Sequence, residues 1–187
     1  MIFYIADIHF GHKNAISFDQ RPYQDVEEMD RVLIENWNYR VQEDDDVYIL
    51  GDFCFNAKQK PEWYLEQLKG HKHLIQGNHD RGIIKREEVR QYFASIDPLL
   101  GIMDDGKKIV LCHYPIAEWY GYYRGVWHVY GHIHLGLRGG TGAYMRRQER
   151  ALNAGCMING YMPVTFNELV RNNEAFNRRC QKEEGSE

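Results

Sequence analysis

Short apolar runs alternate along the chain with segments in which apolar residues recur every three or four positions. The apolar runs are rich in β-branched and aromatic residues and end at Gly, Asp or Asn, which is typical of buried strands. They cover residues 1–6, 46–50, 72–76, 107–113, 126–132 and 150–155. Strands that alternate with helical segments predict an α/β fold in which helices cover a sheet.

The helical segments predict three helices between these strands. The clearest begins after Asp25, which stands three positions before Glu28 as in a capping box. Its apolar side consists of Val26, Met29, Leu33 and Trp37. A second helix is expected over residues 61–68, because proline suits a first helical turn, and a third over residues 85–93.

The pattern also predicts how the chain is divided. Asp105 and Gly106 lie between two apolar runs and predict a hairpin turn, so part of the sheet is expected to be antiparallel. Residues 1–171 are expected to form one domain, long enough to bury roughly 70% of its unfolded surface. The segment 172–187 is polar and ends in charged residues, and its last residues are expected to be flexible.

Composition and charge narrow the class of protein. The chain is 43% hydrophobic and 27% charged, as in globular proteins, and no apolar run approaches the ~20 residues of a membrane span. Its start lacks a basic leader and runs directly into Asp7 and His9, which favours a first strand over a secretory signal. A cytoplasmic protein without a membrane partner is therefore expected. The net charge of -4 argues against a broad surface for duplex nucleic acid.

The four cysteines are distant from one another and form no C-x-x-C motif. They are Cys54, Cys112, Cys156 and Cys180. Their apolar surroundings predict buried free thiols with no catalytic role.

Polar side chains with metal-binding atoms follow five of the predicted strands, at the point where each strand ends. The segments are Asp7 to His9, Gly51-Asp52, Gly77 to Asp80, His113, and His132 with His134. In an extended backbone, His132 and His134 would point the same way. Each segment alone has an ordinary explanation, such as a turn or a hydrogen-bonded core histidine. Because loops at the carboxyl ends of strands converge in α/β sheets, the five together predict one site.

The donor set predicts two metal ions. Its seven members are Asp7, His9, Asp52, Asn78, His113, His132 and His134. Seven oxygen and nitrogen donors are too many for one tetrahedral zinc ion, and they suit Mn²⁺ best, with Fe, Ni²⁺, Zn²⁺ or Mg²⁺ as alternatives. Two ions ~3.5–4 Å apart can activate a bridging hydroxide for in-line attack at phosphorus. The carboxylate of Asp52 is the natural bridging ligand.

The segments "DIH", "GDF", "GNHD", "CH" and "GHIH" resemble, in this order, the five motif blocks of the calcineurin-like metallophosphoesterase superfamily. The resemblance covers about residues 1–166 and is strongest to small bacterial and phage phosphoesterases. It implies a four-layer α/β/β/α sandwich of two mixed sheets flanked by helices. It also implies one ion bound by Asp7, His9, Asp52 and His134, and another bound by Asp52, Asn78, His113 and His132.

The same resemblance implies roles for the residues around the ions. His79 would reach the phosphate and protonate the leaving oxygen, and Asp80 would help to orient the site. Candidate substrate contacts are Asn78, His79, Arg81, Tyr123, Arg124 and His12. Tyr123 and Arg124 belong to an aromatic segment, residues 114–125, that either walls the substrate site or packs on its own domain.

Three functions fit these residues. The first is a dinuclear phosphohydrolase that cleaves a phosphomonoester or phosphodiester, with a nucleotide-derived compound among the candidate substrates. The second is a non-catalytic metal-binding interaction module on the same fold, and the third is a single-metal hydrolase. The complete donor set and the presence of His79 favour the first.

Overall fold

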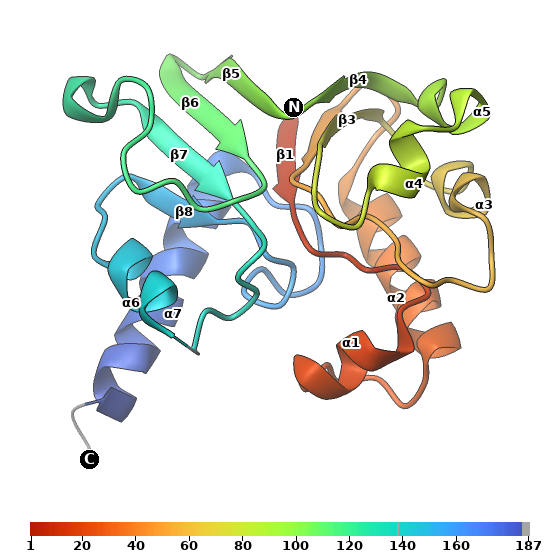
Figure 1. Ribbon diagram of the computed structural model, residues 1–187, viewed down its shortest axis with the longest axis horizontal. Helices are drawn as coiled ribbons and strands as arrows, with labels where there is room; N and C mark the ends of the chain where they lie inside the picture. The colour runs from red at the N-terminus through yellow and green to blue at the C-terminus, as the bar shows by residue number, and fades with distance from the viewer. Residues whose placement is uncertain (138, 185–187) are drawn as a thin grey trace.

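The computed structural model describes residues 1–137 and 139–184, in which two four-stranded sheets pack together with helices outside them (Figure 1). The first sheet consists of β1 (Ile2–Ile5), β2 (Asp46–Ile49), β3 (His71–Ile75) and β4 (Phe93–Asp97), in that order. The second consists of β5 (Leu99–Asp104), β6 (Lys107–Cys112), β7 (Trp127–Tyr130) and β8 (Ala151–Asn153). The predicted sandwich of two sheets flanked by helices is confirmed.

The two sheets differ in strand direction. Strands β1 to β4 are all parallel, whereas β5 is antiparallel to β6 and the pairs β6–β7 and β7–β8 are parallel. Only the second sheet is therefore mixed. The predicted hairpin turn joins β5 to β6, with Asp105 at φ 45° and Gly106 at φ 75°, the left-handed pair that a two-residue hairpin favours.

The helices are α1 (Lys13–Phe18), α2 (Val26–Arg40), α3 (Pro61–Leu65), α4 (Arg81–Ile84), α5 (Glu87–Arg90), α6 (Gly140–Arg146) and α7 (Phe166–Glu184). The predicted cap of α2 is confirmed, since the Asp25 carboxylate accepts a hydrogen bond from Glu28 N at 2.8 Å. The helix expected over residues 85–93 is wrong. Arg86 adopts an extended conformation between α4 and α5, and Phe93 already begins β4.

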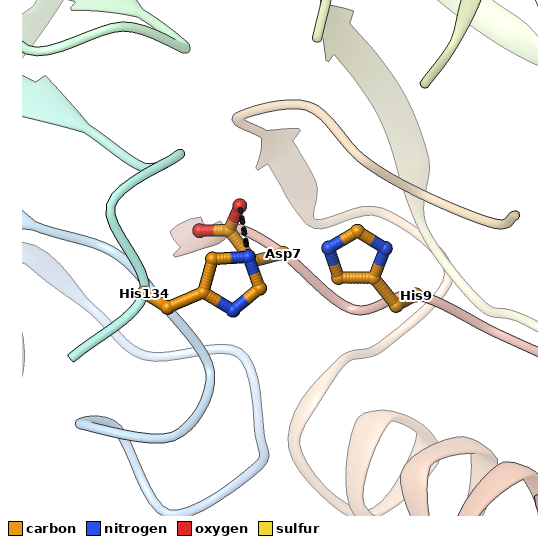
Figure 2. Close-up of side chains that lie close together, drawn as sticks. All are labelled: Asp7, His9 and His134. Carbon is orange, nitrogen blue, oxygen red and sulfur yellow. Dashed lines mark ion pairs between the residues drawn. The ribbon is translucent and has the colours of Figure 1, made fainter. Parts of the chain in front are cut away.

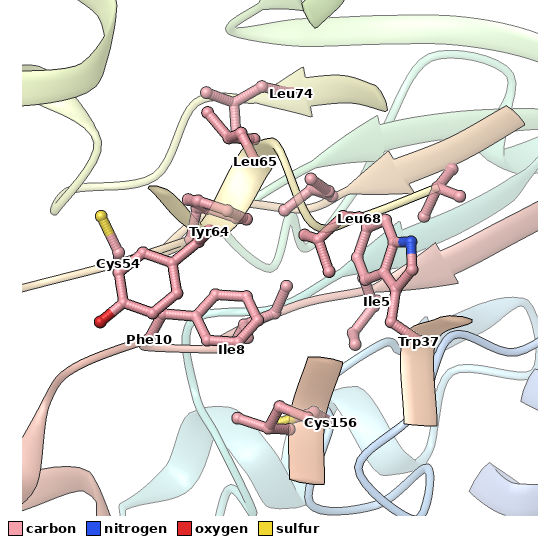
Figure 3. Packing of buried hydrophobic residues seen from close by; sticks show 14 of the residues in the cluster. Ile5, Ile8, Phe10, Trp37, Cys54, Tyr64, Leu65, Leu68, Leu74 and Cys156 are labelled. Carbon is pink, nitrogen blue, oxygen red and sulfur yellow. The ribbon is translucent and has the colours of Figure 1, made fainter. Parts of the chain in front are cut away.

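Each face of the sheets is covered by apolar side chains. Because side chains alternate along a strand, Phe3 and Ile5 face α2 and α3, whereas Tyr4 faces the second sheet. Figure 3 shows the layer under α2, where Trp37 is buried; fully burying an apolar side chain contributes about 1.5–3 kcal/mol. The outer face of the second sheet is covered by Trp119 and Val126, and by Met145 of α6.

The polar C-terminal segment is helical as far as it is described. The domain boundary expected between residues 171 and 172 falls inside α7. Asn173, Phe176 and Cys180 of this helix are buried, so the segment packs on the domain. Residues 185–187, the end of the expected flexible tail, lie outside the described residues.

Two further expectations concern the whole chain. All four cysteines are buried free thiols, as predicted. Among the described residues, every helix is too short or too polar to cross a membrane.

Candidate metal centre

The structure brings the predicted donors together in loops where the two sheets meet. Asp7, His9, Asp52 and Asn78 follow strands of the first sheet, and His113, His132 and His134 follow strands of the second. The ligand atoms of Asp7, His9 and His134 lie within 4.8 Å of one another (Figure 2), as do those of Asp7, Asp52 and His113. Residues more than 120 positions apart in the sequence thus share one site.

Five of the seven donors adopt a left-handed backbone conformation. They are Asp7 (φ 55°), His9 (φ 54°), Asp52 (φ 55°), His132 (φ 70°) and His134 (φ 51°). Such a conformation costs of order 1–3 kcal/mol for a residue other than glycine, and it is concentrated at functional sites. The expectation that His132 and His134 lie on an extended strand is therefore wrong. His132 faces Asn78, whereas His134 faces Asp7 and Asp19.

Two glycines allow the loops to approach this closely. A Cβ atom on Gly77 would lie 2.4 Å from Asp52 Oδ1, and one on Gly51 would lie 2.3 Å from His113 Nδ1. Both distances are shorter than atoms tolerate. The glycines beside these donors are thus required by packing.

The carboxylate of Asp52 lies between the two groups of donors. Its Oδ1 accepts a hydrogen bond from His79 N at 2.9 Å. Its Oδ2 lies 3.7 Å from His9 Nε2, 3.6 Å from His113 Nε2 and 4.0 Å from His79 Nε2. One oxygen is therefore held by the backbone, while the other faces imidazoles from both sheets.

Asp80 is a buried carboxylate that joins the loops after β2 and β3. Its Oδ2 accepts hydrogen bonds from Asp52 N at 2.9 Å and Gly77 N at 2.8 Å, and its Oδ1 accepts one from Phe53 N at 3.0 Å. Burial raises the pKa of Asp80 above its ordinary value. Its contacts are those of a residue that positions Asp52.

The group around His9 has the composition of a cation site. Both ring nitrogens of His9 are buried and have no hydrogen-bond partner among the residues that the structure describes. Burial together with the charge of His134 lowers the pKa of His9 to about 2. Burial raises the pKa of Asp7 to about 6. A buried carboxylate beside a buried neutral imidazole is an unfavourable pair on its own and a favourable one around a divalent cation.

The second group is built around Asn78. Its Oδ1 lies 3.0 Å from His113 Nε2 and 3.0 Å from His132 Nδ1. His113 Nδ1 donates to Leu50 O at 2.7 Å, the kind of contact that orients a metal-binding histidine, and Nε2 faces the other donors. The residues of both groups therefore fit divalent ions.

Two supporting residues were not predicted from the sequence. Asp19 places both carboxylate oxygens 2.9 Å from His134 Nδ1. Arg21, also buried, donates to Asp19 Oδ2 at 2.9 Å, to Asp7 O at 2.9 Å and to Ile8 O at 2.7 Å. Burial lowers the pKa of His134, but the hydrogen bond with Asp19 and the charge of Asp7 outweigh it and raise that pKa overall.

Asp19→Asn is expected to lower the affinity for Mn²⁺ about 10- to 100-fold, because a ligand histidine depends on its carboxylate partner for orientation and basicity. Isothermal titration of the metal-free protein measures the affinity. Asp44→Asn, at an exposed position, is the control and should bind normally. Unchanged affinity in folded Asp19→Asn would show that Asp19 does not support His134.

The candidate substrate contacts fall into two sets. One set lies beside the donors. The ring centre of His79 is 5.5 Å from that of His9, and the ring centre of His12 is 5.4 Å from it. Arg81 lines the same surface hollow as His79. Tyr123, whose hydroxyl donates to Glu118 at 3.4 Å, and Arg124 lie in the 114–125 segment.

The aromatic segment packs mainly on the outer face of the second sheet. Trp119 is buried there, and its Nε1 donates to Val126 O at 2.9 Å. The aromatic residue that reaches the donors is Tyr114, with its ring centre 4.6 Å from that of His132. The sequence singled out other tyrosines of this segment, and a substrate contact by Tyr123 or Arg124 stays a prediction.

Comparison with known proteins places the chain in a family. No family model matches it. It is 31% identical over 172 residues to the uncharacterized protein MJ1445 of Methanocaldococcus jannaschii, covering 91% of this chain and 89% of that protein.

One solved structure shares the architecture of this chain. The protein of unknown function AQ665 from Aquifex aeolicus, 27% identical, aligns with a TM-score of 0.71 over 91% of this chain and 98% of its own. The nuclease MPE of Pseudomonas putida is more distant, with 20% identity and a TM-score of 0.46 over 71% of this chain and 60% of its own. The chain belongs to the same family as MJ1445 and has the fold of AQ665.

Proposed function

We propose that this protein is a dinuclear metal-dependent phosphohydrolase. The observation that carries the proposal is the position of Asp52, whose Oδ2 lies between His9 Nε2 and His113 Nε2 at 3.7 and 3.6 Å. A carboxylate oxygen that faces donors from both groups is placed to be shared by two ions.

The donors and their burial support two divalent ions, with Mn²⁺ as the expected metal. One ion would be held by Asp7, His9, Asp52 and His134, and the other by Asp52, Asn78, His113 and His132. Oxygen and imidazole donors without a thiolate suit Mn²⁺, Fe, Ni²⁺ or Zn²⁺. When bound, such ions lower the pKa of a water molecule and neutralise charge on a phosphoryl group.

The residues of the chain would divide the remaining work. His79 is partly exposed beside Asp52, so it can approach a bound phosphoester and donate a proton to the leaving oxygen. Asp80 holds the loop of Asp52 against the loop of His79, because its carboxylate accepts three hydrogen bonds from backbone N–H groups of the two loops. Asp19 and Arg21 hold His134 and the backbone of Asp7.

The order of the five sequence motifs supports the same reaction, since it resembles that of the calcineurin-like metallophosphoesterases. The alternative, a metal-binding interaction module, needs the fold and the ions but not His79. A measurement of hydrolysis therefore distinguishes the phosphohydrolase from the interaction module. The number of bound ions distinguishes the dinuclear phosphohydrolase from a single-metal hydrolase.

Protein loaded with Mn²⁺ and desalted is expected to contain close to two ions per chain and to hydrolyse p-nitrophenyl phosphate or bis(p-nitrophenyl) phosphate. Chelation should abolish hydrolysis, and added Mn²⁺ should restore it. Elemental analysis and release of nitrophenolate measure the two quantities. One ion per chain with full activity would contradict the dinuclear site, and two ions without hydrolysis of either ester would favour the interaction module.

A further inference from the structure

Two hollows near the candidate metal centre share wall residues from the segment 55–59. The first, the His12 cavity, has a volume of about 780 Å³ and lies between α1, α2 and α3. The second, the His79 hollow, has a volume of about 490 Å³ and includes Asn78 and His79. Asn56 and Gln59 line both. The segment 55–59 is thus a partition between two spaces.

The metal donor His9 lies between the histidines that mark these spaces. Its ring centre is 5.4 Å from that of His12 and 5.5 Å from that of His79. The ring of Phe55 is close to the same two histidines, with its centre 5.0 Å from that of His12 and 4.0 Å from that of His79. A phosphoryl group bound beside His9 would have one hollow on each side.

We propose, building on the phosphohydrolase function above, that the substrate is a phosphodiester whose leaving alcohol lies in the His79 hollow and whose retained group lies in the His12 cavity. An oxygen of water bonds to phosphorus, the bond to the ester oxygen on the His79 side breaks, and that oxygen takes a proton. The products are one alcohol and one phosphomonoester. A monoester would use only one of the two hollows.

Several charged groups of the His12 cavity already have partners. Glu27 pairs with Lys58 at 2.8 Å, and Arg31 pairs with Glu35 at 2.9 Å. The carboxylate of Asp30 accepts a hydrogen bond from Gly11 N at 2.8 Å and another from the Tyr64 hydroxyl at 2.9 Å. The lining of the cavity holds four acidic and three basic side chains, so it suits an uncharged group better than a second phosphate.

The remaining walls suit a flat group with polar edges. Trp63, 42% exposed, offers an aromatic surface, and Val26 and Ile34 add apolar area. His12 also lines the cavity and adds a polar ring to these walls. An exposed aromatic surface beside a polar ring fits the base of a nucleoside.

The test compares two diesters with the same leaving group, thymidine 5′-(p-nitrophenyl phosphate) and methyl p-nitrophenyl phosphate, on the Mn²⁺-loaded protein. The nucleoside diester is expected to have a kcat/KM about tenfold higher, because a base can stack on Trp63. Trp63→Ala should bring the ratio close to one without slowing the methyl diester, and Trp63→Phe should keep most of it. Tyr39→Ala is the control, because Tyr39 is an exposed aromatic residue of α2 outside both hollows. It should change neither the ratio of the two kcat/KM values nor the rate with the methyl diester.

Each contrary result overturns a defined part of this picture. A ratio close to one in the unmodified protein, or an equal loss with both diesters in folded Trp63→Ala, would overturn the assignment of the His12 cavity. Hydrolysis of p-nitrophenyl phosphate with both diesters inert would overturn the diester proposal and leave the phosphohydrolase intact. Failure to hydrolyse any of the three would overturn both.

Discussion

Asp52→Asn is expected to lower kcat/KM for p-nitrophenyl esters by about 10³-fold and to reduce the bound Mn²⁺ well below two ions per chain. Asparagine keeps an oxygen for the hydrogen bond from His79 N, so the loop should hold its shape. It loses the negative charge at Oδ2, which faces His9 and His113. Kinetics and elemental analysis of the desalted variant measure the two losses.

Asp46→Asn is the matched control for this variant. Asp46 begins the same strand, far from the donors, and its carboxylate lies 3.1 Å from His73 Nε2. It should retain both ions and normal turnover. If Asp52→Asn retained as much metal as the unmodified protein, Asp52 would not be the shared ligand.

His79→Ala is expected to slow hydrolysis of an alkyl phosphoester by about 10²–10⁴-fold while both ions stay bound. An alkoxide needs a proton as it leaves, and His79 is the partly exposed imidazole beside Asp52 that is left outside the proposed ligand sets. The rate of hydrolysis of a p-nitrophenyl ester should fall less, because nitrophenolate leaves without protonation. Comparison of the two esters at equal metal content isolates this step.

His71→Ala, at an exposed histidine at the start of β3, provides the comparison for His79→Ala. It should hydrolyse both esters at the normal rate and retain both ions. Loss of an ion from His79→Ala would mean that His79 is a ligand. Full activity on the alkyl ester would refute its role as a general acid.

The donors could be predicted from the sequence because their positions follow from the strands. Apolar runs mark the strand ends, and parallel strands deliver their carboxyl ends to one edge of a sheet. Asp19 and Arg21 carry no such mark. Asp19 lies 115 residues from His134 in the sequence, so the contact between them can be recognised only when the folded loops are known.

The parts of the fold that were missed have local causes. The sequence indicates β5 only through the hairpin turn that follows it, because its exposed positions include the apolar Leu99 and Met103 and its residues therefore do not alternate between apolar and polar. In α7 the apolar residues Leu169 and Phe176 are spaced for a helix, but the polar composition around them concealed that period. The left-handed turns at His132 and His134 depend on contacts across both sheets.

The left-handed backbone at five donors has a thermodynamic consequence. The conformational cost at Asp7, His9 and Asp52 is borne by the folded chain whether or not the site is filled, and the unfolded chain does not bear it. An ion that binds only the folded arrangement shifts the unfolding equilibrium by mass action. Ions bound as proposed would therefore raise the melting temperature of the protein as the metal concentration increases.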